Sequence, residues 1–156
     1  MQSRQLMVLR HELAAALPTS AAFLADRERR LMVVRAYVYA PPLQSLVEQL
    51  RGQGRTVEAA DQPAAIRAFK AGRADALILG SNSLAVLRAR DPAFNAAHAA
   101  LDYAPGNVTI GALAMSRQRI SAEDRALLRR TLEDMVREGF VEDARLRHLG
   151  DMVDSP

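Results

Sequence analysis

The sequence predicts an α/β protein, a three-layer α/β/α sandwich in which helices cover both faces of a mostly parallel sheet. Dense apolar runs of strand length alternate with stretches in which apolar residues recur at helical spacing. Three consecutive units read strand, turn, helix, which predicts parallel strands joined by right-handed crossovers. The 156 residues, of which 49% are apolar and 25% charged, are enough for one compact domain.

The chain begins with a short apolar strand, which we expect over Gln5–Leu9. The Ala-rich stretch His11–Ala25 predicts helix, interrupted near Pro18 because proline lacks a backbone donor. Thr19 and Ser20 are suited to cap a second short helix after that proline. A charged connector then leads into the next strand.

Three strand–turn–helix units form the centre of the chain. Their predicted strands are residues 31–38, 56–60 and 74–79. Each following helix has a start signal: Pro41 and Pro42 for the first, Asp61 as N-cap for the second, and the Gly80–Ser83 turn for the third. Glycines end the first two helices, at Gly52 and Gly72.

The last third of the chain is less regular. After Asp91 and Pro92, we expect a helix over 93–100, a brief strand over 101–103 and a longer strand over 108–115. Ser121 with Asp124 resembles a capping box and opens a helix that ends at Gly139. The apolar stripe of this helix is Leu127, Leu128, Leu132, Met135 and Val136. A short helix over 140–149 and a loose tail over 151–156 complete the chain.

Composition argues against several classes of protein. All but one of the 21 basic residues are arginine, yet the net charge is only +3, less than the dense basic surface of a nucleic-acid-binding protein requires. The absence of cysteine excludes disulfide scaffolds, thiolate metal sites and cysteine nucleophiles. No uncharged run reaches the roughly 18 residues of a membrane-spanning helix.

No catalytic or metal-binding motif is present. His11, His98 and His148 share no ligand spacing, and the sequence has no G-x-S-x-G elbow, Gly-rich phosphate loop or H-E-x-x-H motif. Carboxylates on the terminal helices are spaced for ion pairs with neighbouring arginines. We therefore predict neither an enzyme nor a bound metal or cofactor.

The turns after the parallel strands suggest a binding site. In an open parallel sheet, ligands bind at the carboxyl ends of the strands, where helix N-termini direct free N–H groups outward. The candidate ligand-binding residues on this edge are Tyr37, Tyr39, Asp61, Ser81 and Asn82. We expect ring or hydroxyl contacts from the tyrosines, charge from Asp61 toward a cationic group, and hydrogen bonds from Ser81 and Asn82. The alternative is that Asp61 and Ser81 only cap helices, and we expect Arg35 to pair across the sheet.

Four segments together resemble one family. Gln5–Arg10 is similar to a hinge strand, Leu31–Tyr39 to the strand and loop that follow it, and Phe69–Gly80 (FKAGRADALILG) to a characteristic strand-entry segment. Val108–Ser116 with Ser121–Gly150 is similar to the returning hinge strand and the terminal helices. The chain thus resembles the second lobe of the type II periplasmic solute-binding proteins, amino-acid type, which deliver solutes to ABC importers.

The resemblance implies a periplasmic-binding-protein-like II single lobe with C-terminal helices. Residues 1–116 would be the ligand-binding lobe with both hinge strands, 117–150 the helices that pack on a first lobe absent from this chain, and 151–156 the tail. Two departures argue against an ordinary α-amino acid as ligand. Gly80 stands where the family commonly has an acidic residue for the ligand ammonium, and Ala36 and Tyr37 replace a Gly-Thr pair.

The implied function is a solute-binding module of an ABC importer that holds a small polar solute, amino-acid-like or an organic acid or amine. The alternative is a ligand-sensing domain of a regulator or sensor kinase with the same fold. The implied partner is an ABC permease and the implied location is the periplasm, as part of a secreted parent, because the chain itself begins without a signal peptide. Without the first lobe, the stripe on the terminal helix would be exposed, so we expect a homodimer.

Overall fold

A computed structural model describes residues 2–110 and 114–149. The chain divides into two compact units, one over Ser3–Thr109 and the other containing residues 1–2 and 110–156. The predicted domain boundary at residue 116 stays a prediction.

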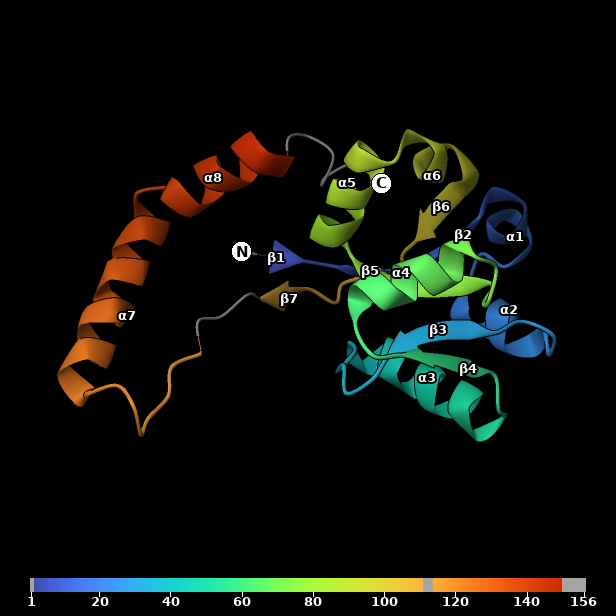
Figure 1. The fold of residues 1–156 in the computed structure, drawn as a ribbon, viewed down its shortest axis with the longest axis horizontal. Coiled ribbons are helices and arrows are strands. Elements are labelled where there is room, and N and C mark those ends of the chain that lie inside the picture. The colour runs from blue at the N-terminus through green and yellow to red at the C-terminus, as the bar shows by residue number, and fades with distance from the viewer. Residues whose placement is uncertain (1, 111–113, 150–156) are drawn as a thin grey trace. The chain divides into compact units, whose positions relative to one another are not determined.

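The larger unit contains a five-stranded sheet and six helices (Figure 1). In chain order its elements are β2 (Gln5–Arg10), α1 (His11–Ala16), α2 (Ser20–Ala25), β3 (Leu31–Val34), α3 (Pro41–Gly52), β4 (Thr56–Ala59), α4 (Gln62–Lys70), β5 (Ala76–Gly80), α5 (Ser81–Arg90), α6 (Pro92–Ala97) and β6 (His98–Leu101). The strands lie in the order β4-β3-β5-β2-β6.

Four of the five strands run in the same direction. β3 pairs in parallel with β4 and β5, whereas β2 is antiparallel to both β5 and β6. This confirms the predicted mostly parallel sheet. Gln5, the first residue of β2, lies opposite Gly80, the last residue of β5. The start of β2 therefore shares an edge with the carboxyl ends of the parallel strands.

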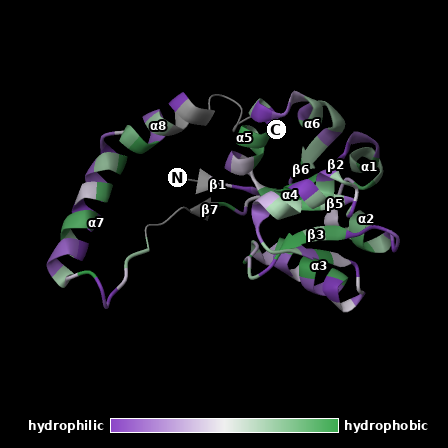
Figure 2. Cartoon of the chain, in the orientation of Figure 1, coloured by the Kyte–Doolittle hydropathy of each residue, from purple (hydrophilic) through white to green (hydrophobic). Residues whose placement is uncertain are grey.

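The core lies in two layers, one on each face of the sheet. Met7 and Leu9 belong to one hydrophobic cluster and Val8 to the other, as the alternation of side chains along a strand requires. Residues of α1, α2 and α3 complete the first cluster, and residues of α4, α5 and α6 complete the second. Figure 2 shows the resulting hydrophobic band along β3. The predicted three-layer architecture is confirmed.

Two elements differ from the prediction. The strand expected over 31–38 ends at Val34, because the backbone N–H of Val34 donates to the hydroxyl of Tyr39 at 2.9 Å as the chain turns back. The helix expected over 93–100 ends at Ala97, and the next four residues form β6. There Ala99 and Ala100 pair with Leu9 and Val8, so strand pairing overrides the helix propensity of alanine.

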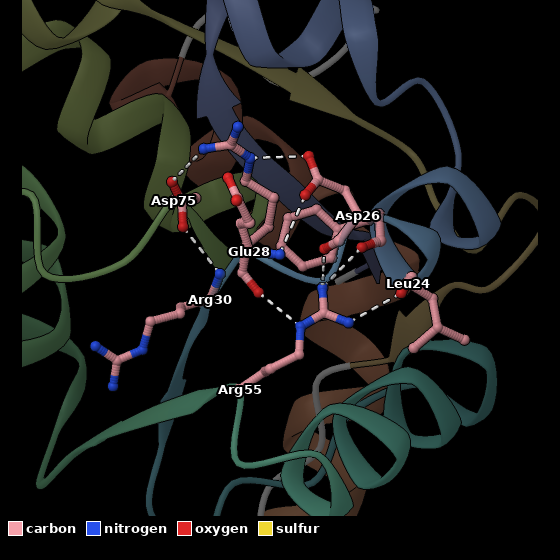
Figure 3. Close-up of polar contacts among 8 residues, drawn as sticks. Leu24, Asp26, Glu28, Arg30, Arg55 and Asp75 are labelled. Carbon is pink, nitrogen blue, oxygen red and sulfur yellow. Dashed lines mark hydrogen bonds and ion pairs between the residues drawn. The ribbon is translucent and has the colours of Figure 1, made fainter.

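A buried arginine joins the helix α2, the connector after it and β4. Arg55 is 7% exposed and precedes β4. Its guanidinium points into a group of oxygens (Figure 3). It donates to the carbonyl oxygens of Phe23, Leu24, Asp26 and Arg29 and to Oε1 of Gln53. Three of these carbonyls lie at the C-terminal end of α2, where helical carbonyls lack an internal partner.

The smaller unit contains α7 (Ala122–Arg137) and α8 (Phe140–Leu149). Ser121 caps α7, accepting from the N–H of Asp124 at 3.0 Å, as predicted, and Gly139 adopts a φ of 78° between the helices. Two short strands, β1 (Gln2–Ser3) and β7 (Thr109–Ile110), pair with each other. Part of the strand expected over 108–115 lies outside the described residues. The tail expected over 151–156 lies outside them entirely.

Within residues 2–110 and 114–149, no helix combines the length and the hydrophobicity that crossing a membrane demands.

Replacing Arg55 by methionine tests the buried network. We expect the free energy of unfolding to fall by about 3–5 kcal/mol, since several buried carbonyls lose their donor at once. The measurement is urea denaturation followed by circular dichroism. The matched control is Arg51→Met, which removes only a surface ion pair with Glu58 and should cost less than about 1 kcal/mol. Equal losses in both variants would contradict this role for Arg55.

Candidate functional site

Three strand–helix junctions meet at the carboxyl edge of the sheet. They follow β3, β4 and β5, which are parallel neighbours, so their turns lie side by side (Figure 1). The start of β2 joins them at this edge. All five predicted site residues lie in these junctions: two tyrosines after β3, Asp61 after β4, and Ser81 and Asn82 after β5.

The loop after β3, residues 35–40, is held by side chains from other elements. Gln5 binds it twice: Oε1 accepts from the N–H of Ala40 at 2.6 Å, and Nε2 donates to the carbonyl of Val38 at 3.4 Å. Gln44 in α3 accepts from the N–H of Tyr39 at 3.3 Å. The sequence analysis missed Gln5, and the available signal was a polar residue at the start of an apolar strand.

One residue of this loop has a backbone conformation that L-residues rarely adopt. Ala36 has a φ of 59°, and among the described residues it is the non-glycine residue with a positive φ. The left-handed region costs an L-residue about 1–2 kcal/mol. The contacts of Gln5 and Gln44 around it hold the loop in this conformation, because such a backbone persists only where the surrounding structure constrains it.

The two tyrosines of this loop differ in environment. Tyr39 is 6% exposed, its hydroxyl accepts from Val34, and burial raises its pKa above the usual value. Tyr37 is 52% exposed, with its ring centroid 6.0 Å from that of Tyr39 and its hydroxyl 3.5 Å from Oε1 of Gln62. Tyr37 is thus available at the surface, while Tyr39 supports it from behind.

The helix after β4 has a side-chain cap. Oδ1 of Asp61 accepts from the N–H of Ala64 at 2.7 Å, which confirms the capping interpretation. Pro63 in the first turn has no N–H to satisfy. The exposed carboxylate of Asp61 keeps further acceptor capacity on its other oxygen, since an ionised carboxylate accepts several hydrogen bonds.

The helix after β5 has no side-chain cap. The N–H of Ser81 donates to the carbonyl of Arg4 at 2.8 Å, and the hydroxyl of Ser81 accepts from the N–H of Arg4 and lies 3.2 Å from the hydroxyl of Ser3. Ser81 therefore ties α5 to the start of β2 rather than capping its own helix. In the part of the chain that the structure describes, Oδ1 of Asn82 is buried without a hydrogen-bond partner.

Arg35 is placed differently from the expectation. It lies beyond the end of β3, is exposed, and forms no ion pair among residues 2–110 and 114–149. Arg35 therefore pairs across the sheet only through its backbone, whose N–H donates to the carbonyl of Ala59 in β4 at 2.9 Å, and not through its side chain. Over those same residues, no group of three His, Cys, Asp or Glu side chains is placed to hold a metal ion.

The structure resembles solved amino-acid-binding proteins. The GluR0 ligand-binding core complexed with L-glutamate matches with a TM-score of 0.70 at 12% identity over 96% of this chain and 61% of that one. An ancestral arginine-binding protein bound to arginine gives 0.66 at 14% identity, over 94% and 60%. An amino acid ABC transporter substrate-binding protein from Streptococcus pneumoniae, bound to L-arginine, gives 0.61 at 13% identity, over 97% and 57%.

The chain thus spans about 60% of the length of these proteins. No family model matches the chain, and no curated protein matches it in sequence. Most of these similar structures are binding proteins, and an ancestral cyclohexadienyl dehydratase is also among them. At these identities the likeness establishes the fold.

Ala36→Gly tests the strain in the loop after β3. Glycine adopts positive φ without steric cost, and this gain exceeds the backbone entropy that glycine adds to the unfolded chain. We expect the free energy of unfolding to rise by about 0.5–1 kcal/mol, measured by urea denaturation. The opposite change, Gly54→Ala at a φ of 68° with open space around it, should lower stability by about 1 kcal/mol. A destabilised Ala36→Gly variant would refute the strain.

Proposed function

Since the chain has the fold of the type II periplasmic solute-binding proteins, we propose that it is a solute-binding lobe that holds a small polar solute at the carboxyl edge of its sheet. The main observation in support of this proposal is that two neighbouring helices on that edge begin differently. α4 is capped by Asp61, whereas α5 has no side-chain cap and carries the unpartnered Oδ1 of Asn82. A solute bound there would satisfy both the helix N–H groups and the amide.

Each candidate residue has a role in this proposal. Asn82 and the free N–H groups at the start of α5 hydrogen-bond the solute, and Ser81 fixes that helix start against β2 through Arg4. Tyr37 provides an exposed ring against the solute, with Tyr39 packed beneath it. Asp61 attracts a cationic group of the solute with the oxygen that capping leaves free.

The similar structures narrow the chemistry of the solute. Two of them hold arginine and one holds glutamate, so small polar amino-acid-like molecules and related acids or amines are the proposed class. An ordinary α-amino acid is disfavoured, since Gly80 offers no carboxylate for its ammonium. One wall alone buries part of a solute, so we expect millimolar binding by this chain.

We propose transport as the biological setting, with an ABC permease as partner and the periplasm as location. The similarity to an ABC transporter substrate-binding protein supports it. The second candidate is ligand sensing, supported by the similarity to a receptor ligand-binding core. The adjoining coding sequence distinguishes the two: permease genes beside it favour transport, and a DNA-binding or kinase segment in the same reading frame favours sensing.

The binding proposal is tested by NMR titration of the ¹⁵N-labelled chain with a panel of amino acids, polyamines and small carboxylic acids. We expect saturable shifts in residues 35–40 and 80–83 with one class of solute. Asn82→Ala and Tyr37→Ala should each weaken that binding about tenfold, the effect of losing roughly 1.4 kcal/mol of contact. Asp61→Asn, which preserves the helix cap, should weaken the binding of cationic solutes only.

The control for this titration is Gln49→Ala, in the exposed part of α3. It should bind like the unaltered chain. Saturable shifts confined to other regions, or binding that Asn82→Ala and Tyr37→Ala leave intact, would place the solute elsewhere and reject the proposed edge.

We also propose that α7 pairs with α7 of a second copy. No residue of α7 is buried, and Leu127, Leu128, Leu132 and Val136 are 36–58% exposed. Asp124 and Arg129 lie on opposite flanks of the stripe, five positions apart, which is the spacing of ion pairs across a parallel helix pair. The apolar stripe of one α7, with these two flanking charges, is therefore complementary to the same surface on a second copy of the chain.

Sedimentation velocity over a range of concentrations tests this pairing. We expect a reversible monomer–dimer equilibrium. Leu128→Glu and Leu132→Glu should each raise the dimer dissociation constant at least tenfold, because each places a charge in the apolar contact. Ala126→Glu, on the opposite side of α7, is the matched control and should dimerise normally. A monomer at every concentration would exclude the dimer, while leaving solute binding untouched.

A further inference from the structure

An open hollow of about 240 Å³ lies along α4, from Ala64 in its first turn to Arg73 in the turn that follows the helix. It is lined by Ala64, Arg67, Ala68, Ala71 and Arg73. The alanines recur at positions i, i+4 and i+7, so they form one face of the helix and leave room between the two arginines. A water occupies about 30 Å³ of liquid, so the hollow is large enough for a phosphate-sized group with its hydration.

A third arginine approaches the same turn. Arg10 ends β2, and its Nη2 atom lies 3.8 Å from the position that a Cβ on Gly72 would occupy. Gly72 stands between Ala71 and Arg73, both of which line the hollow. Arg10 and Arg73 are therefore both at the turn between α4 and β5, and Arg67 lies in the last turn of α4. All three arginines are exposed.

These three cations have no anionic partner within the described residues: Arg10, Arg67 and Arg73 take part in none of the ion pairs or side-chain hydrogen bonds there. The nearby carboxylates are engaged elsewhere. The carboxylate of Asp75 accepts from Arg29 and from the N–H of Arg30, and that of Asp91 accepts from Lys70 and from the N–H of Phe94. None of these three arginines is therefore paired with a carboxylate among the described residues, and the nearest counter-charge is the partial negative charge at the C-terminal end of α4.

Helix capping does not explain these arginines. Lys or Arg near a helix C-terminus often binds the last carbonyls. Here backbone N–H groups already do so: Ala71 donates to Arg67, Gly72 to Phe69 and Arg73 to Ala68, at 2.8–3.1 Å. The guanidinium groups are thus left free to bind another acceptor.

We infer that this hollow binds a small phosphate-type oxyanion between Arg67 and Arg73, with Arg10 contributing from β2. The planar guanidinium fork binds two oxygens of a phosphate at once, which suits arginine to this role. Arg73 precedes β5 and Arg10 ends β2, so both lie at the amino edge of the parallel strands, opposite the proposed solute edge. An anion there neutralises charge that the fold itself leaves unpaired.

Calorimetric titration of the full chain with inorganic pyrophosphate at low ionic strength tests the site. We expect saturable 1:1 binding that weakens as salt is added, because exposed charges are screened. Arg67→Ala and Arg73→Ala should each reduce the affinity about tenfold. Arg90→Ala, an exposed arginine at the end of α5, should bind like the unaltered chain.

Two further arms separate this site from its alternatives. Asn82→Ala should leave pyrophosphate binding unchanged. If this variant lost affinity for pyrophosphate, the anion would bind at the solute edge instead, and the inference would be overturned. Vesicles of phosphatidylglycerol in phosphatidylcholine distinguish a lipid headgroup from a free anion: binding to vesicles without binding to pyrophosphate would also overturn it. So would binding that both arginine variants retain in full.

Discussion

The hydrogen bonds of Arg55 fix the geometry on which the candidate site depends. One buried guanidinium binds the end of α2 and the connector that leads into β3. β3 is the strand between β4 and β5, so its position sets where the chain leaves the sheet at the opposite edge. The loop with Ala36 and Tyr37 is thus positioned from the far end of its own strand. The charge is tolerated inside because every direction of the guanidinium meets an oxygen.

Local signals predicted the parts of the fold that local interactions determine. Thr19, Asp61 and Ser121 cap the helices that their sequence positions indicated, each by a bond to a backbone N–H three residues on. Contacts between distant segments account for the rest. The end of β3 depends on the Tyr39 hydroxyl, and β6 forms only because β2 is beside it. The sequence of residues 98–101 has no alternating pattern that would predict this pairing.

The same division applies to the candidate site. The junctions themselves follow from strand order, so their meeting at one edge was predictable. The difference between the starts of α4 and α5 could not be predicted, because it depends on Ser81 binding Arg4, a residue far away in the sequence. Gln5 escaped prediction for the same reason. β2 thus does more than complete the sheet, since its start supplies contacts that shape two of the three junctions.

The placement of β2 also has a consequence for synthesis of the chain. β2 precedes its sheet neighbours β5 and β6, which are residues 76–80 and 98–101, by a long stretch of chain. About ninety residues must therefore leave the ribosome before this strand has both partners, and until then its apolar residues Leu6–Leu9 remain unpaired. Closing so long a loop makes the sheet a late and slow event in folding. During synthesis, chaperones would therefore be needed chiefly to shield β2.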